Sequence, residues 1–78
     1  MVQKLQLDKS ASALAKIFGE NCRQHRKAKN LSQAELSKMT GIAIPHLSNI
    51  ENGRANPTLE IMEAISDALQ TTLVSMLS

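Results

Sequence analysis

The most constraining feature of this chain is the segment 32–53, which has the pattern of two short helices around a tight turn. Residues 32–35, Ser-Gln-Ala-Glu, have the spacing of a capping box, in which two side chains satisfy backbone N–H groups at a helix start. Gly41 suits the turn, because glycine adopts left-handed backbone angles at little cost. Pro45 suits the first turn of a second helix beginning at residue 44 or 45, and Gly53 suits its end.

A longer helical pattern precedes this segment. From about Ser10, apolar and partly apolar residues recur on one stripe, which comprises Leu14, Ile17, Phe18, Cys22 and His25. Gly19 lowers helix propensity by roughly 1 kcal/mol relative to alanine, so we expect this helix to begin late or to bend there. Asn30 is suited to a left-handed helix stop.

Two further helices are expected after the segment. Thr58 can cap a helix with Leu59, Met62, Ile65 and Leu69 as its core stripe, and Thr72 can cap a short final helix. In the first of the two central helices, Leu36 and Met39 are expected to face inward. We therefore predict an all-α, five-helix domain over residues 10–78. Residues 1–9 are predicted to be an N-terminal tail, although they also match a short edge strand weakly.

Length and composition limit the functions that the chain can have. With 78 residues, it holds one domain with a modest core and no separate catalytic domain. Phe18 is its one aromatic residue. The chain is therefore not expected to bind single-stranded nucleic acid or RNA by stacking bases on aromatic rings. The motifs offer no grouping of nucleophile, base and orienting residue, so we expect no enzymatic activity and no cofactor.

Cysteine usage and hydropathy bear on the cellular compartment. Cys22 is the single cysteine, so no intramolecular disulfide can form. Cys22 and His25 lie one helical turn apart, but two ligands do not close a tetrahedral metal site, and we expect a core thiol and a half-buried imidazole instead. The chain has no secretory signal pattern and no apolar run of membrane-spanning length. We expect a cytoplasmic, nucleoid-associated protein.

Charge is unevenly distributed along the chain. All nine Lys and Arg residues lie within residues 1–54 with four acids, giving +5, whereas the remainder has three acids and no Lys or Arg, giving −3. Such a domain can place a basic face on a polyanion and keep another face for a protein partner. Lys16, Arg23 and Lys27 lie opposite the apolar stripe of the first helix, where they can either solvate that helix or contact phosphates.

Two helices around a tight turn form a helix-turn-helix, in which the second helix lies in the DNA major groove and the first crosses the backbone. At about 100° per residue, Leu47 and Ile50 mark the buried side of the second helix. The opposite side carries Pro45, Ser48, Asn49 and Asn52, with His46 on its flank. Asparagine can pair with adenine, whereas Ile44 and Pro45 offer apolar surface to a thymine methyl.

A wider set of residues forms one recognisable pattern. It comprises Arg26, the run 31–36, Gly41, Leu47, the run 50–53, Asn56-Pro57 and Leu69. Leu-Ser-Gln followed eighteen residues later by Glu-Asn-Gly is its most specific part. From about Phe18 to Leu77 the chain thus resembles the phage-repressor and Cro type of helix-turn-helix domain, the XRE family, which implies a five-helix lambda-repressor-like fold.

The resemblance implies roles for the matched positions. Taken with the angular estimate, it gives a base-reading set of Ile44, Pro45, Ser48 and Asn49. The residues expected to contact the DNA backbone are Gln33, His46, Asn52 and Arg54. Arg26 and Glu51 match a structural ion pair that joins the first helix to the third. The chain departs from the family where Ala43 replaces the usual Ser or Thr cap and where Gln70 replaces the usual glycine.

Together these features predict a sequence-specific transcriptional regulator, a repressor or controller, that binds double-stranded DNA as a homodimer on an inverted repeat. The dimer contact is expected at the C-terminal end, with Leu73, Val74 and Leu77, where Val74 faces outward. The alternative is an antitoxin or adaptor that acts through protein contacts with a toxin or RNA polymerase. The polar Gln33, Asn52 and Arg54 favour the DNA-binding prediction, because an adaptor has no need of phosphate-facing groups.

Overall fold

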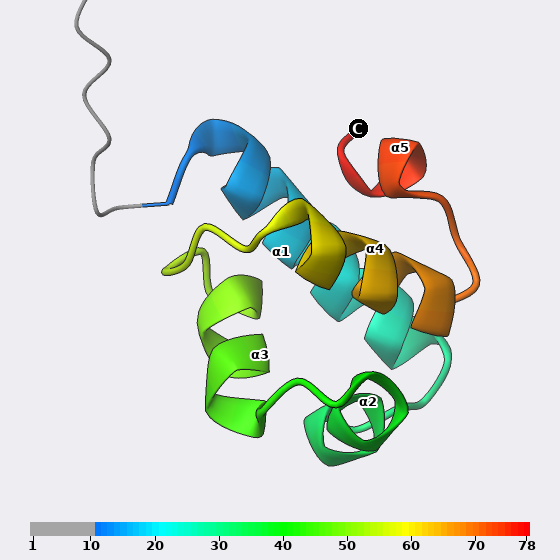
Figure 1. The fold of residues 1–78 in the computed structure, drawn as a ribbon. Coiled ribbons are helices and arrows are strands. Elements are labelled where there is room, and N and C mark those ends of the chain that lie inside the picture. The colour runs from blue at the N-terminus through cyan, green and yellow to red at the C-terminus, as the bar shows by residue number, and fades with distance from the viewer. Residues whose placement is uncertain (1–10) are drawn as a thin grey trace, which may run out of the picture.

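The computed structural model describes residues 11–78, within which the chain forms five helices and no strand. In chain order the helices are α1 (Ala13–Ala28), α2 (Gln33–Thr40), α3 (Ile44–Glu51), α4 (Leu59–Ala68) and α5 (Leu73–Met76). α1 contacts α3, α4 and α5, and α5 lies away from the α2–α3 pair (Figure 1). The all-α, five-helix prediction is confirmed, whereas the predicted tail of residues 1–9 lies outside the described residues. None of the helices within residues 11–78 has the length and hydropathy to span a membrane.

The start of α1 is fixed by a side-chain cap. The hydroxyl of Ser12 accepts the backbone N–H of Ala15 at 3.1 Å, which satisfies one of the donors left free at a helix start. The backbone N–H of Ser12 donates to Oδ1 of Asn56 at 2.7 Å, so the same residue ties α1 to the loop before α4. The helix therefore begins at Ala13, later than the predicted start near Ser10.

The segment 32–53, which contains α2, the turn and α3, has the predicted local geometry. The hydroxyl of Ser32 accepts the N–H of Glu35 at 3.0 Å, and Oε1 of Glu35 accepts the N–H of Ser32 at 3.0 Å, which completes the capping box. Gly41 has φ 77°, in the left-handed region. α3 begins at Ile44, as predicted, after Ala43, whose side chain makes no cap hydrogen bond.

The other helix ends follow the same local rules. The hydroxyls of Thr58 and Thr72 each accept the backbone N–H three residues further on, at 3.2 and 3.1 Å, so both predicted caps are confirmed. Asn30 and Gln70 both have φ 57° at the ends of α1 and α4. The left-handed stop at Asn30 is therefore confirmed, and Gln70 adopts the conformation that a glycine would take more easily.

Gly19 is the point of closest approach between α1 and α3. A Cβ atom at this position would overlap the backbone carbonyl oxygen of Ile50. α1 runs continuously from Ala13 to Ala28, so the expected late start or bend at Gly19 is wrong. The glycine is instead explained by packing, because only a residue without a side chain lets the two backbones come this close.

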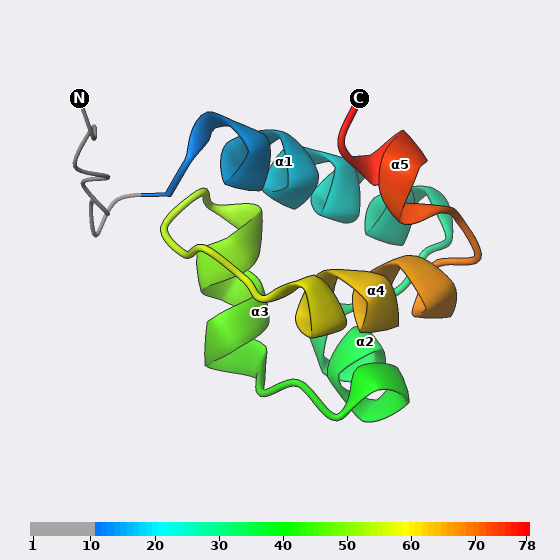
Figure 2. The ribbon, with the colours of Figure 1, turned by 45° about the horizontal axis from the view of Figure 1, so that its top comes forward.

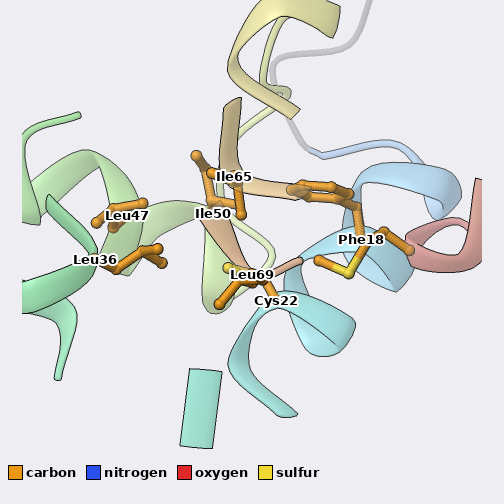
Figure 3. Close-up of a cluster of buried hydrophobic side chains, with 8 residues drawn as sticks. Phe18, Cys22, Leu36, Leu47, Ile50, Ile65 and Leu69 are labelled. Carbon is orange, nitrogen blue, oxygen red and sulfur yellow. The ribbon is translucent and has the colours of Figure 1, made fainter. Parts of the chain in front are cut away.

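The hydrophobic core is formed by side chains from all five helices and by Leu69, which directly follows α4. Its buried members are Phe18, Cys22, Leu36, Leu47, Ile50, Ile65, Leu69 and Met76. Figure 3 shows side chains from α1, α2 and α3 in one cluster with Ile65 and Leu69 of the α4 region. This packing fixes the angle at which α3 leaves the bundle, because Leu47 and Ile50 are both fully buried.

Four apolar residues that the spacing placed on inward stripes are exposed. They are Leu14, Ile17, Met39 and Leu59, with 56%, 39%, 53% and 62% of their surface accessible. On α1 the inward side is carried by small residues, Ala15 and Gly19, beside Phe18 and Cys22. The buried side of α1 is thus rotated away from Leu14 and Ile17, because α3 packs against α1 at Gly19.

The C-terminal end is attached to α1 by a side-chain amide. Nδ2 of Asn21 donates to the carbonyl oxygens of Met76 and Ser78, at 2.8 and 3.1 Å. α5 contacts both α1 and α4, and Figure 2 shows it beside α1. The C-terminal end is therefore held against the middle of α1.

Candidate nucleic-acid interface

One face of α3 packs into the core and the other is open to solvent. Leu47 and Ile50 are fully buried, whereas Ile44 is 44% exposed and Pro45 and Asn49 are also exposed. α3 lies at an edge of the bundle, with no helix on its outer side (Figure 1). The helix predicted to read bases thus presents a mixed apolar and amide surface of the kind that a major groove can accept.

The two asparagines of this face differ in what they offer to a ligand. Nδ2 of Asn52 donates to the backbone oxygen of Ser48 at 2.8 Å and lies 3.3 Å from its hydroxyl oxygen. The side chain of Asn49 makes no hydrogen bond within residues 11–78 and keeps both its donor and its acceptor. Asn49 therefore has the freedom that a bidentate base contact requires, whereas Asn52 and Ser48 are engaged with each other.

His46 is half-buried. Its Nε2 atom is buried and has no hydrogen-bond partner within the described residues. The contact of His46 with the DNA backbone stays a prediction, and it would have to be made by Nδ1 because Nε2 is buried. The angular estimate placed the residue on a flank of α3 but did not decide to which side the ring turns.

Arg26 and Glu51 form a bidentate ion pair between α1 and α3. Nε of Arg26 donates to Oε2 of Glu51 at 2.8 Å and Nη2 donates to Oε1 at 2.9 Å, with side chains only 11% and 3% exposed. Nη1 of Arg26 also donates to the carbonyl oxygen of Leu31 at 2.7 Å. One guanidinium thus fixes α1, the loop before α2 and the end of α3 relative to each other.

Two more donors reach the same carboxylate. Nε2 of Gln33 donates to Oε1 of Glu51 at 3.1 Å, and Sγ of Cys22 lies 3.6 Å from Oε2. Burial by itself would raise the pKa of Glu51, but the hydrogen bonds from Arg26 and Gln33 outweigh it and hold that pKa below its ordinary value. Burial and the neighbouring Glu51 charge raise the pKa of Cys22 to about 12, so the thiol stays protonated in the core.

The sequence pattern placed Gln33 and Glu51 in separate roles, but the structure joins them. Gln33 begins α2 and is half-buried, and one hydrogen of its amide is directed at Glu51. The contact orients the side chain of Gln33, because Glu51 is itself held by Arg26. No sequence signal identifies this bond, since it depends on the angle at which α2 meets the end of α3.

Further cations surround this network. A depression of about 230 Å³ is lined by Arg23, Arg26, Lys27, Gln33, Glu51 and Asn52. Arg54 is exposed in the loop after α3, and its backbone N–H donates to the carbonyl oxygen of Asn49 at 2.8 Å. The polar residues predicted to contact a backbone, apart from His46, therefore lie at the start of α2 and around the end of α3.

The predicted dimer residues lie on a different side of the protein. Val74 is 78% exposed, whereas Leu73 and Leu77 are half-buried and pack against the core. An apolar groove of about 260 Å³ lies near them, lined in part by Leu14, Leu59 and Leu77. The exposed apolar residues of α1 and α4 thus adjoin the C-terminal end.

Comparison with known proteins places the chain in a family. The helix-turn-helix profile matches residues 23–75. A helix-turn-helix-type transcriptional regulator of Sinorhizobium fredii is 31% identical over 65 residues, which cover 83% of this chain and 84% of that protein. The control protein C.SmaI of Serratia marcescens is 29% identical over 65 residues, covering 83% of this chain and 77% of that protein.

A solved structure extends the likeness to three dimensions. The P22 c2 repressor in complex with a synthetic operator superimposes with a TM-score of 0.73 and 34% identity, over 78% of this chain and 92% of the repressor. The family profile spans α2, α3 and α4 in full, together with the last part of α1. The chain therefore belongs to the helix-turn-helix family of non-enzymatic, DNA-binding transcriptional regulators that includes phage repressors and control proteins.

Proposed function

We propose that this protein is a sequence-specific repressor or controller that binds an inverted-repeat operator as a homodimer. The observation that carries the proposal is the division of α3 into a fully buried side, with Leu47 and Ile50, and an exposed side, with Ile44, Pro45 and Asn49. A helix held rigidly by one side can present the other to base edges with little loss of conformational freedom on binding.

The site divides into residues that read bases and residues that hold the backbone. Asn49 reads a base through its free amide, and Ile44 and Pro45 supply apolar shape to thymine methyls. Ser48 belongs with the base-reading residues, and its hydroxyl lies 3.3 Å from Nδ2 of Asn52. Gln33, Asn52 and Arg54 contact phosphates. Because two of the base-facing residues donate no side-chain hydrogen bond, part of the specificity comes from DNA deformability.

Dimerisation follows from the small size of the reading surface. A single short helix contacts only a few base pairs, so a two-fold dimer doubles the site and places its half-sites about one helical turn, roughly 10 base pairs, apart. Val74 is the most exposed of the large apolar residues in the described part of the chain. It belongs to α5, which lies away from α3 (Figure 1). We assign the dimer contact to Val74 with Leu73 and Leu77 beside it.

The test is selection of binding sites from a random duplex library with the full chain, followed by titration of the selected duplex. We expect an inverted repeat with half-sites about one helical turn apart and an affinity that falls steeply with salt. Sedimentation of the protein with the duplex should give two chains per site. Weak association that is indifferent to sequence would overturn the proposal and favour an adaptor that acts through protein contacts.

A further inference from the structure

We propose that α1 carries a phosphate-binding site, in which Arg23 and Lys27 together bind one backbone phosphate of the DNA beside Gln33. This inference rests on the proposed DNA-binding function and extends its footprint from the α2–α3 unit onto α1. The family resemblance assigns no role to either residue. From the sequence alone, both could equally be solvent-exposed cations of α1.

The first observation is that these cations converge on a depression of suitable size. Arg23 and Lys27 line the hollow of about 230 Å³ in which Gln33 and Asn52 also take part. Arg26 and Glu51 line the same hollow, but they are paired with each other and nearly buried. The positive charge open to a ligand is therefore that of Arg23 and Lys27.

The second observation is that these charges lack protein partners. Within residues 11–78, the single ion pair is that of Arg26 with Glu51. Glu20 lies on the same helix, three residues from Arg23, but its carboxylate accepts a hydrogen bond from Gln24 at 3.2 Å. Arg23 and Lys27 are four residues apart, where like charges on a helix repel each other by a few tenths of a kcal/mol. An anion between them removes this repulsion.

The third observation is continuity with the face of α3. A second depression, of about 340 Å³, is lined by Lys16, Glu20, Arg23, Asn52 and other residues at the end of α3. Arg23 and Asn52 line both depressions, so the two hollows share a border. The side chain of Lys16 packs against Gly53, where α3 ends. A DNA strand whose phosphates pass Asn52 would therefore come next to the cations of α1.

The experiment measures how operator affinity changes with salt for Arg23→Ala, Lys27→Ala and the double variant. Each phosphate contact that is lost lowers the slope of log K against log salt by about 0.9. We expect the double variant to lose one such contact per subunit, with the selected sequence unchanged. Lys29→Ala is the matched control, because Lys29 is an exposed cation on the next residue after α1 whose Nζ bonds Oε1 of Gln70 at 3.2 Å.

The outcomes distinguish this phosphate-binding site from the function on which it rests. A double variant whose slope matches that of Lys29→Ala, while wild-type protein still binds its operator, would overturn the proposed site. Wild-type protein that selects no operator would instead overturn the proposed function. Melting curves exclude a folding defect, because removing the repulsion between Arg23 and Lys27 should leave the midpoint unchanged or slightly raised.

Discussion

Glu51, at the last position of α3, accepts two hydrogen bonds from the guanidinium of Arg26 on α1, at 2.8 and 2.9 Å. The same carboxylate also orients Gln33 at the start of α2. The three helices that build the candidate interface therefore share one nearly buried charge, so this pair acts on the geometry of the whole site as well as on stability.

Replacing Glu51 with alanine should destabilise the fold strongly. The change leaves the guanidinium of Arg26 buried without its counter-charge, which costs on the order of 3–5 kcal/mol in comparable buried pairs. Urea denaturation should show a lower midpoint, with Glu63→Ala as the exposed control. An unchanged midpoint together with an altered base preference would assign Glu51 to DNA reading instead.

The same carboxylate predicts loss of stability in acid. The pKa of Glu51 is lower in the folded protein than its ordinary value near 4.3, so its contribution is fully present above about that pH. The contribution is lost as the pH falls through the lower, folded-state pKa. Stability measured from pH 7 to pH 2 should therefore decline below about pH 4. Glu51→Gln should flatten this decline, and an equal decline in both proteins would contradict the assignment.

Gly19→Ala separates local propensity from packing by the sign of its effect. Helix propensity alone predicts a gain of about 1 kcal/mol in an uninterrupted helix. The overlap of the new Cβ with the carbonyl oxygen of Ile50 predicts a loss, of about 1–3 kcal/mol for a typical overpacked site. Thermal melting should give a lower midpoint, and a higher one would mean that α1 and α3 separate at little cost.

Asn49→Ala and Arg54→Ala should affect DNA binding in different ways. Loss of the free amide of Asn49 removes discrimination worth about 1–3 kcal/mol at one position of each half-site. Loss of Arg54 weakens binding to all duplexes alike, because a phosphate contact carries no sequence information. Binding-site selection with each variant is the measurement. If Asn49→Ala keeps the wild-type preference at every position, Ser48 becomes the leading candidate for the base-reading residue.

Val74→Glu should convert the dimer that we propose to monomers. A charge at this exposed apolar position would have to be desolvated in the interface that we assign to the C-terminal end. Sedimentation equilibrium measures the change, and Met39→Glu on α2 is the matched control because Met39 is also exposed and lies away from α5. A dimer that persists in Val74→Glu would move the interface elsewhere, for example to the groove that Leu14 and Leu59 line.

The helices and their ends were predictable from the sequence because the interactions that set them are local. Ser32 and Glu35 satisfy each other across three residues, and Thr58 and Thr72 each cap the N–H three residues on. Gly41 takes a left-handed angle because it has no Cβ, and Asn30 does so because a short polar side chain tolerates that conformation. The resemblance also matched Arg26 with Glu51, through a spacing that local rules alone do not explain.

The tertiary structure decided which sides of these helices are covered. Leu14 and Ile17 lie at helical spacing with Phe18, yet they are exposed because α3 packs against α1 at Gly19. Helical periodicity defines a stripe but not its rotation about the axis, which depends on the shape of the neighbouring helix. The bond from Gln33 to Glu51 and the burial of Nε2 of His46 have the same origin, since each depends on how the helices pack together.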